Sequence, residues 1–144
     1  MTAIFGVAPG AFPDLELISE LGRGADTVVY RVRRQGRDYA LKLMTRAGGD
    51  RALTAIRREA ALMGCVGHPL LPKIFEVGQV EAGPYLILEY IDGPPLSQVL
   101  QDGALDPERA VRLAIDVLAP LAAAHRTGLV HRDVKPDNVI VCTD

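Results

Sequence analysis

The order of strand-like and helix-like segments constrains the fold of this chain more than any other feature of its sequence. Five runs rich in apolar, β-branched or aromatic residues are predicted to form strands: 15–21, 27–32, 39–44, 73–77 and 85–90. Residues 35–38 suit a hairpin turn, so the first three runs are expected to form an antiparallel meander. A polar turn that contains Gly83 and Pro84 is expected to join the last two runs.

Helical patterns interrupt and then follow these runs. After the break at Gly48-Gly49, Asp50 is predicted to cap a helix. Apolar residues recur there at helical spacing: Leu53, Ile56, Ala60 and Met63. A loop is expected over residues 64–72, and a short helix over 96–101 after Pro94-Pro95.

A second long helix is predicted to start at the capping Asp106, with Pro107 at its first position. Gly128 is placed to end it in a left-handed cap. Pro120 removes one helical hydrogen bond and predicts a kink or an early end. The expected apolar stripe of this helix comprises Ala110, Ala114, Val117, Leu118 and Leu121.

Five strands around one helix, followed by a mainly helical segment, predict an α+β fold of two unequal lobes. The 144 residues suit one compact domain, and 49% hydrophobic residues can build its core. A net charge of −2 offers no broad surface for nucleic acid. Secretion signals and membrane-spanning stretches are lacking, and Cys65 and Cys142 are expected to be buried, reduced thiols. We therefore expect a cytoplasmic protein.

Two glycines, Gly22 and Gly24, flank Arg23 after the first strand-like run. Glycines let a backbone approach a phosphate closely, although two glycines in a hairpin also fit an ordinary turn. A strand follows them instead of a helix, which excludes a dinucleotide-binding fingerprint. Thr27 stands where a GxGxxG pattern would have its third glycine, and Val29, on the same strand face, could cover an apolar base.

Lys42 interrupts an apolar run, and strand alternation places it on one face with Ala40 and Met44. A solvated edge could explain it, but a buried ammonium would need a partner. Glu59 supplies one candidate, because it falls within the apolar stripe of the first helix. A Lys42–Glu59 ion pair would satisfy both charges and leave donors of Lys42 for a phosphate.

The run His131-Arg132-Asp133-Val134-Lys135-Pro136-Asp137-Asn138 is a polar loop between apolar segments. Asp133 could accept a proton from a hydroxyl, Lys135 could face a transferring phosphate, and the amide oxygen of Asn138 could bind a metal ion. A solvated loop with chance charges is the alternative, which the specific order of eight residues disfavours.

These motifs resemble, in their order and their elements, a eukaryotic-type (Hanks-type) serine/threonine protein kinase domain. The resemblance covers the chain from about residue 15 to its end. It implies ATP, Mg²⁺ and a protein with an acceptor serine or threonine as ligands. It also implies a flexible segment at 1–13, a five-stranded N-lobe at 14–92, and a hinge exit with the beginning of a helical C-lobe at 93–144.

The resemblance further implies a role for each matching position. The backbone of Gly22, Arg23 and Gly24 would cover the ATP phosphates, and Lys42, positioned by Glu59, would bind the α- and β-phosphates. Asp133 would take the hydroxyl proton, Lys135 would neutralise the γ-phosphoryl group, and Asn138 would hold Mg²⁺. The adenine site would be formed by these residues: Leu21, Val29, Ala40, Leu88, Glu89, Ile91 and Ile140.

The sequence departs from the family pattern in one major respect, since no DFG segment occurs before Asp144. The chain is therefore expected to be part of a longer polypeptide and to be inactive, or nearly so, by itself, with a second lobe that is poorly packed or sticky. Two alternatives remain: a nucleotide-binding pseudokinase or truncated interaction module, and a small-molecule phosphotransferase. The Asp133–Asn138 spacing favours a protein substrate over the latter.

Overall fold

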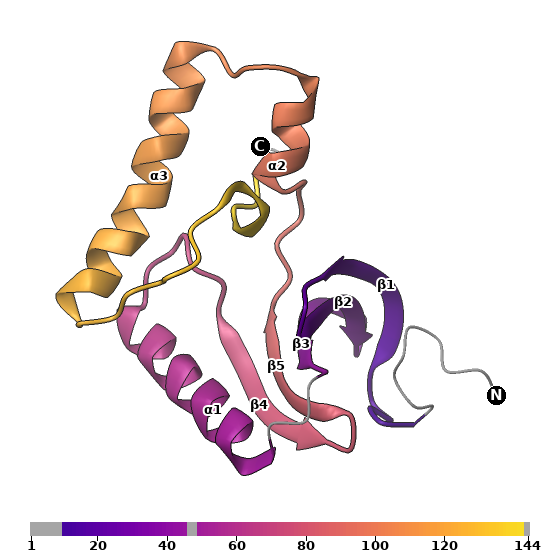
Figure 1. Cartoon of the computed structure of the whole chain (residues 1–144). Coiled ribbons are helices and arrows are strands. Elements are labelled where there is room, and N and C mark those ends of the chain that lie inside the picture. Colours follow the sequence, from indigo (N-terminus) through magenta and orange to yellow (C-terminus); the bar gives the residue numbers. More distant parts are fainter. Residues whose placement is uncertain (1–9, 46–48, 143–144) are drawn as a thin grey trace. The chain divides into compact units, whose positions relative to one another are not determined.

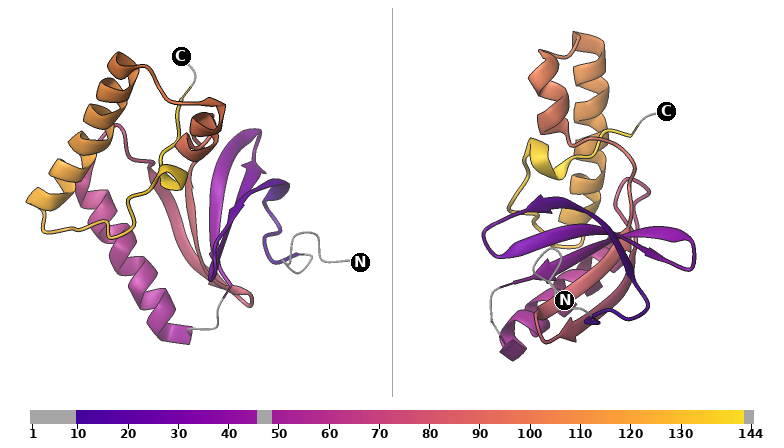
Figure 2. Two further views of the ribbon diagram at one scale, coloured as in Figure 1. Left: turned by 45° about the horizontal axis from the view of Figure 1, so that its top comes forward. Right: turned by 90° about the vertical axis from the view of Figure 1, so that its right-hand side faces the viewer.

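The computed structural model describes residues 10–45 and 49–142, without the side chains of residues 49, 50, 55, 59 and 62 (Figure 1). Its centre is one five-stranded antiparallel sheet with the strand order β1-β2-β3-β5-β4. The strands are β1 (Glu16–Arg23), β2 (Thr27–Arg34), β3 (Arg37–Met44), β4 (Ile74–Val80) and β5 (Gly83–Glu89). All five predicted strands are confirmed, and Figure 2 shows the twist of their sheet.

Two of the turns are shorter than predicted because the flanking strands extend into them. Arg34 pairs with Arg37, so only Gln35 and Gly36 form the β2–β3 turn, with φ of 51° and 77°. Positive φ at both central residues is typical of the tight hairpin turn that matches strand twist. Gly83, predicted to lie in a turn, is instead the first residue of β5.

The sheet buries apolar side chains on both faces. In β2 and β3 the buried side chains are two residues apart, so they lie on one face of the sheet. They belong to the first apolar cluster, which contains Val28, Tyr30, Val32, Leu41, Leu43 and Ile87. Phe12 and Leu15, which precede β1, pack against this cluster. On the other face, Leu86 packs with Ile56 and Ala60 of α1 (Gly49–Val66). The predicted helix periodicity of α1 thus supplies the second cluster, and strand alternation divides the apolar residues between the two faces of the sheet.

Helix α1 differs from its prediction at both ends. It begins at Gly49, so Asp50 lies inside the helix and not at its N-cap. It continues to Val66, so the loop expected from residue 64 starts three residues later. The predicted short helix is confirmed as α2 (Leu96–Val99), followed by the 3₁₀ turn η2 (Leu100–Asp102).

Helix α3 (Pro107–Arg126) has both predicted caps. The Arg109 N–H donates to Asp106 Oδ1 at 3.1 Å. At the other end, Gly128 has a φ of 79°, its N–H donates to the His125 carbonyl, and the Leu129 N–H donates to the Ala124 carbonyl. This paired pattern is a Schellman motif. An early end at Pro120 is wrong, because the helix continues through this residue to Arg126.

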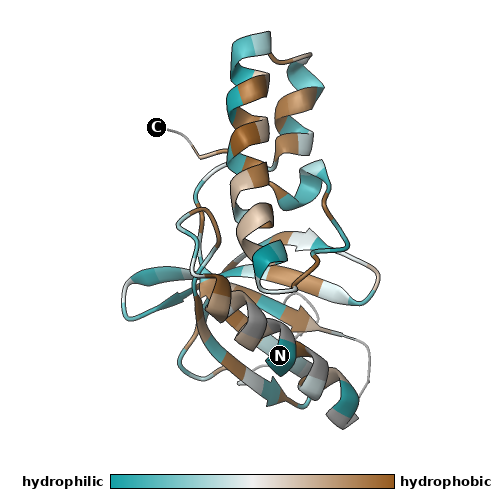
Figure 3. Ribbon diagram, turned by 90° about the vertical axis from the view of Figure 1, so that its left-hand side faces the viewer, coloured by the Kyte–Doolittle hydropathy of each residue, from teal (hydrophilic) through white to brown (hydrophobic). Residues whose placement is uncertain are grey.

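The apolar stripe of α3 was predicted only in part. Val117 and Leu121 are half-buried, but Ala110, Ala114 and Leu118 are exposed. Val111, Ile115 and Leu118 are 59%, 59% and 61% exposed and recur at helical spacing. Apolar residues therefore also occupy an exposed face of the helix, whose hydropathy Figure 3 displays. The cysteines Cys65 and Cys142 are free but exposed, not buried as expected.

The chain forms two compact units. The first comprises Met1–Ala61 and Pro72–Tyr90, and the second comprises Leu62–Leu71 and Ile91–Asp144. One boundary between the compact units lies after Tyr90. The predicted domain limits at residues 13/14 and 92/93 stay predictions. None of the helices in the described part of the chain is long and apolar enough to cross a membrane.

Candidate active site

The polar segment at 131–138 belongs to the second unit, where backbone hydrogen bonds anchor its exit. Residues 136–138 form the 3₁₀ turn η3 (Pro136–Asn138). The Leu96 N–H then donates to the Val139 carbonyl at 2.7 Å, and the Val141 N–H donates to the Pro94 carbonyl at 2.9 Å. The Schellman motif of α3 precedes the segment. Regular structure on both sides thus holds a loop that carries exposed polar side chains.

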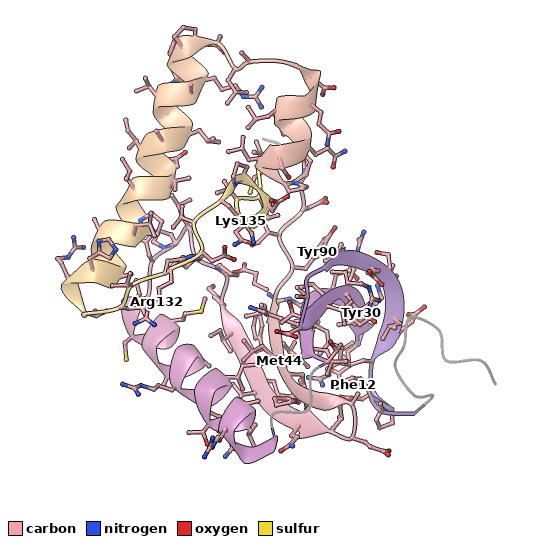
Figure 4. The ribbon with its side chains drawn as sticks, in the orientation of Figure 1. Phe12, Tyr30, Met44, Tyr90, Arg132 and Lys135 are labelled. Carbon is pink, nitrogen blue, oxygen red and sulfur yellow. The ribbon has the colours of Figure 1, made fainter. Side chains whose placement is uncertain are left out.

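The three predicted catalytic side chains lie together in this loop. Lys135 Nζ is 3.0 Å from Asp133 Oδ2. Asn138 Nδ2 donates to the same carboxylate oxygen at 3.1 Å and to the Asp133 carbonyl at 2.8 Å. Figure 4 labels Lys135 on this segment. The structure therefore brings together Asp133, Lys135 and Asn138, as the sequence predicts.

These contacts favour the ionised form of the Asp133 carboxyl. The hydrogen bond from Lys135, and then that from Asn138, lower the pKa of this carboxyl below its ordinary value. The side chain is 63% exposed, so solvent screens both interactions. At neutral pH Asp133 is a carboxylate, the form that can accept a proton.

The backbone around Asp133 is in an uncommon conformation. Arg132 has a φ of 65°, which non-glycine residues rarely adopt. The Asp133 N–H donates to His131 Nδ1 at 3.2 Å, so a hydrogen bond joins the two residues that flank Arg132. Arg132 lies at a bend between α3 and the polar cluster, and Figure 4 labels it on the same segment as Lys135.

Metal binding was predicted for Asn138. Because its Nδ2 donates to Asp133, its Oδ1 is the atom that can ligate a cation. Within residues 10–45 and 49–142, no group of three or more His, Cys, Asp or Glu side chains is arranged to hold a metal. An amide oxygen beside a carboxylate fits Mg²⁺, which takes few protein ligands and completes its shell with phosphate oxygens and water.

In the first unit, Lys42 lies on the sheet face that the sequence predicts. Its register partners are Val29 in β2 and Leu86 in β5, while Ala40 pairs with Leu88. The neighbours Leu41 and Leu43 are buried on the opposite face. Val29, Ala40, Lys42 and Leu88 therefore share one surface of the sheet with Leu86, which packs against α1. Glu59 belongs to α1, but its side chain lies outside the described residues, so the Lys42–Glu59 pair stays a prediction.

Of the two glycines at the connection between β1 and β2, Gly22 is the one with open space around it. The Gly24 N–H donates to the Thr27 carbonyl at 2.8 Å, and Gly22 pairs with Val29. A Cβ atom added at Gly22 would meet nothing within 4 Å, and Gly22 does not have a positive φ. The fold itself therefore does not require glycine at this position, which leaves a close ligand as a reason for it.

Sequence reasoning missed a side chain that fixes this turn. Glu20 accepts hydrogen bonds from Arg23 Nε at 3.0 Å and from Arg23 Nη2 at 2.7 Å. The Arg23 side chain is thus engaged within β1, and coverage of the phosphates by the Gly22–Gly24 backbone stays a prediction. The spacing i, i+3 carries no signal in a strand, where facing residues alternate with period two.

The remaining predicted nucleotide residues are divided between the units. Leu21, Leu88 and Glu89 belong to the first unit, whereas Ile91 and Ile140 belong to the second. Glu89 is fixed twice by Lys73: its N–H donates to the Lys73 carbonyl at 2.8 Å, and its Oε2 accepts from the Lys73 N–H at 3.1 Å. A cleft joining Lys42 to Asp133 would draw on both units and stays a prediction.

Comparisons with known proteins agree with these motifs. A model of the protein kinase domain family matches residues 15–144. The serine/threonine-protein kinase PknL of Mycobacterium tuberculosis is 37% identical over 131 residues, which cover 88% of this chain and 33% of the relative. A probable serine/threonine-protein kinase PknB of Lactococcus lactis is 33% identical over 135 residues, covering 87% and 21%.

Solved structures give the same result. The crystal structure of the Mycobacterium tuberculosis PknI kinase domain superposes with a TM-score of 0.76 at 27% identity. The match covers 99% of this chain and 60% of the PknI chain. The chain spans a third or less of the length of the two curated relatives above. On its motifs, its fold and these matches, the chain belongs to the protein kinase family.

Proposed function

We propose that this chain carries the nucleotide-binding and catalytic-loop parts of an ATP-dependent protein serine/threonine kinase. One observation carries the proposal: Asp133 is held by Lys135 at 3.0 Å and by Asn138 at 3.1 Å in an exposed loop. A carboxylate positioned in this way can orient an acceptor hydroxyl and take its proton. Lysine two residues after that aspartate also supports the serine/threonine class.

Each remaining residue supports the transfer by binding or by charge. Lys135 would move from Asp133 toward the γ-phosphoryl group and neutralise its charge, and Lys42 would hold the α- and β-phosphates. The Gly22–Gly24 backbone would cover them. Mg²⁺, held through Asn138, supplies charge compensation at the phosphate oxygens when bound.

The nucleobase would lie against the sheet face of Val29 and Ala40, with its edge at the backbone of residues 89–91. Leu21 and Leu88 from the first unit, and Ile91 and Ile140 from the second, would complete an apolar site. These contacts supply binding energy without entering the chemistry.

A phosphotransfer assay tests the proposal. The 144-residue sequence contains no Asp-Phe-Gly segment, so the chain alone is expected to show little or no transfer of γ-phosphate to a generic protein substrate. In a chain that includes the complete domain, Lys42→Met and Asp133→Ala should abolish transfer. The exposed Lys73 serves as the control, and Lys73→Met should retain activity.

Two results would contradict the role assignments. Robust turnover by the 144-residue chain would show that no further aspartate is needed. Full activity of both the Lys42→Met and Asp133→Ala variants in the complete domain would remove both residues from the mechanism. Nucleotide binding without any transfer by the complete domain would favour the pseudokinase alternative.

A further inference from the structure

A stacked arginine lies where the first unit ends. The guanidinium Cζ of Arg31 lies 4.5 Å from the ring centroid of Tyr90. Tyr90 directly follows β5 and is the last residue of the first unit (Figure 4). A planar cation at this distance from an aromatic face makes a favourable cation–π contact.

The guanidinium of Arg31 is also held by Asp38. Arg31 Nε donates to Asp38 Oδ2 at 2.8 Å, and Arg31 Nη2 donates to the same oxygen. Arg33 Nε occupies the second oxygen of this carboxylate at 2.7 Å. Since the Asp38 side chain is only 16% exposed, this acceptor is partly shielded from water. The hydrogen bonds from Arg33 and Arg31 lower the pKa of Asp38, so the carboxylate persists at neutral pH.

The position of Arg31 in the sheet places it beside the proposed nucleobase site. Arg31 pairs with Ala40 across β2 and β3 and follows Val29 on the same strand face. Neither Asp38 nor Tyr90 entered the sequence prediction of the site. Arg31 could have been predicted from the sequence, because residues two apart in a strand lie on the same face and Val29 was already assigned to the site.

The segment that leaves β5 is thus held at two consecutive residues. Glu89 is fixed by its two hydrogen bonds with Lys73, which directly precedes β4. Tyr90 is fixed by the stacked Arg31 from β2. Anchors from two different segments of the chain leave the backbone at residues 89 and 90 few conformations, which lowers the conformational entropy that a ligand of this backbone must overcome.

We propose that Arg31 is a positioning residue, which, by stacking on Tyr90, preorganises the backbone of residues 89–91 to bind the edge of a nucleobase. The inference rests on the proposed function for the identity of the ligand. It assigns to Arg31 a contribution to nucleobase affinity, and none to the binding of phosphates or to the transfer step.

Amide hydrogen exchange of the unliganded 144-residue chain tests the positioning itself. Arg31→Leu should speed exchange at residues 89–91 about two- to fivefold, since it removes a contact typical of partly exposed cation–π pairs. Arg33→Leu is the matched control, because Arg33 also binds Asp38 whereas the arginine stacked on Tyr90 is Arg31, and it should leave the exchange of these amides unchanged. Tyr90→Phe keeps the aromatic face on which Arg31 stacks, so in this variant the amides of residues 89–91 should exchange at the rate of the unmodified chain.

The functional consequence is tested by comparing ATP with inorganic tripolyphosphate, which has no nucleobase. Arg31→Leu should weaken ATP binding about two- to fivefold and leave tripolyphosphate binding unchanged. Lys42→Met should weaken the binding of both ATP and tripolyphosphate. In the Arg31→Leu/Tyr90→Leu double variant the loss should not exceed that of either single variant, because both remove one shared contact.

The outcomes separate the two proposals. Unchanged exchange at residues 89–91 in Arg31→Leu, or equal effects of Arg31→Leu and Arg33→Leu, would overturn the positioning role whether or not ATP binds. Equal weakening of ATP and tripolyphosphate by Arg31→Leu would overturn the nucleobase assignment. Failure of the unmodified chain to bind ATP would instead overturn the proposed nucleotide site, and the exchange result would still decide whether Arg31 positions the segment.

Discussion

The side chain of Asn138 reaches across the loop at 131–138 and holds Asp133 at two atoms. Its Nδ2 donates to the Asp133 carbonyl at 2.8 Å and to Asp133 Oδ2 at 3.1 Å. One amide group thus restrains both the main chain and the carboxylate of Asp133. The residue proposed to bind a metal ion therefore also orients the residue proposed to accept a proton.

The pKa of Asp133 should report these contacts directly. Lys135→Met should raise it toward the ordinary value, and Asn138→Ala should raise it by a smaller amount, since Lys135 is the larger cause of the lowering. Carboxyl carbon shifts followed by NMR through an acid titration measure both effects. Because the pKa is lowered by the fold, the stabilising contribution is present above the unfolded-state pKa and is lost as pH falls through the folded-state value. An unchanged pKa in Lys135→Met would contradict the ion pair.

Gly22 offers a way to separate folding from ligand binding. An added Cβ has open space around it, so Gly22→Ala should leave stability unchanged or raise it by about 0.4–1 kcal/mol through the unfolded chain. The same methyl group would stand between the turn and a phosphate, and the affinity for ATP should fall. Chemical denaturation and ATP titration of the same variant provide the two measurements. Loss of stability without loss of affinity would assign Gly22 to the fold instead.

The sequence predicted the elements of this chain well because their signals are local. Strand alternation placed Lys42 and Ala40 on one face, and cap chemistry located Asp106 and Gly128, and each of these follows from neighbouring residues. The polar cluster of the loop at 131–138 was predictable for the same reason, since Asp133 and Asn138 are only five residues apart.

Contacts between distant segments carried no such signal. Arg31 meets Tyr90 only because β2, β3 and β5 are neighbours in one sheet. The exposed apolar face of α3 was not predicted, because apolar residues are spread around more of this helix than the one stripe that the sequence analysis assigned. Leu118, assigned to that stripe, is instead 61% exposed, and only packing partners decide which apolar residues are covered.

Gly78 should tolerate no side chain. It pairs with Tyr85 across β4 and β5, and an added Cβ would lie 2.5 Å from the Tyr85 ring. Gly78→Ala should therefore destabilise the sheet by about 1–3 kcal/mol, since the tyrosine is held by its hydrogen bond to Glu76 and cannot move away without losing it. Amide exchange in β4 and β5 measures the loss.

Gly64 in α1 provides the matched control for this substitution. An added Cβ there meets nothing within 4 Å, so Gly64→Ala should stabilise the helix by about 0.5–1 kcal/mol. If Gly78→Ala is as stable as Gly64→Ala, the close approach of Tyr85 to β4 is wrong.

The exposed apolar residues of α3 should make this chain self-associate. Val111, Ile115 and Leu118 are each more than half exposed and lie at i, i+4 and i+7, which forms a continuous apolar strip along the helix. Burying one such side chain contributes about 1.5–3 kcal/mol, so replacing all three by glutamine should weaken self-association at least about tenfold. Sedimentation velocity over a concentration series measures the change.

Glutamine at the exposed Ala110 and Ala114 is the control, since it adds the same polar groups to α3 without removing large apolar side chains. Equal weakening by the control variant, or a strictly monomeric parent chain, would show that the strip does not drive association.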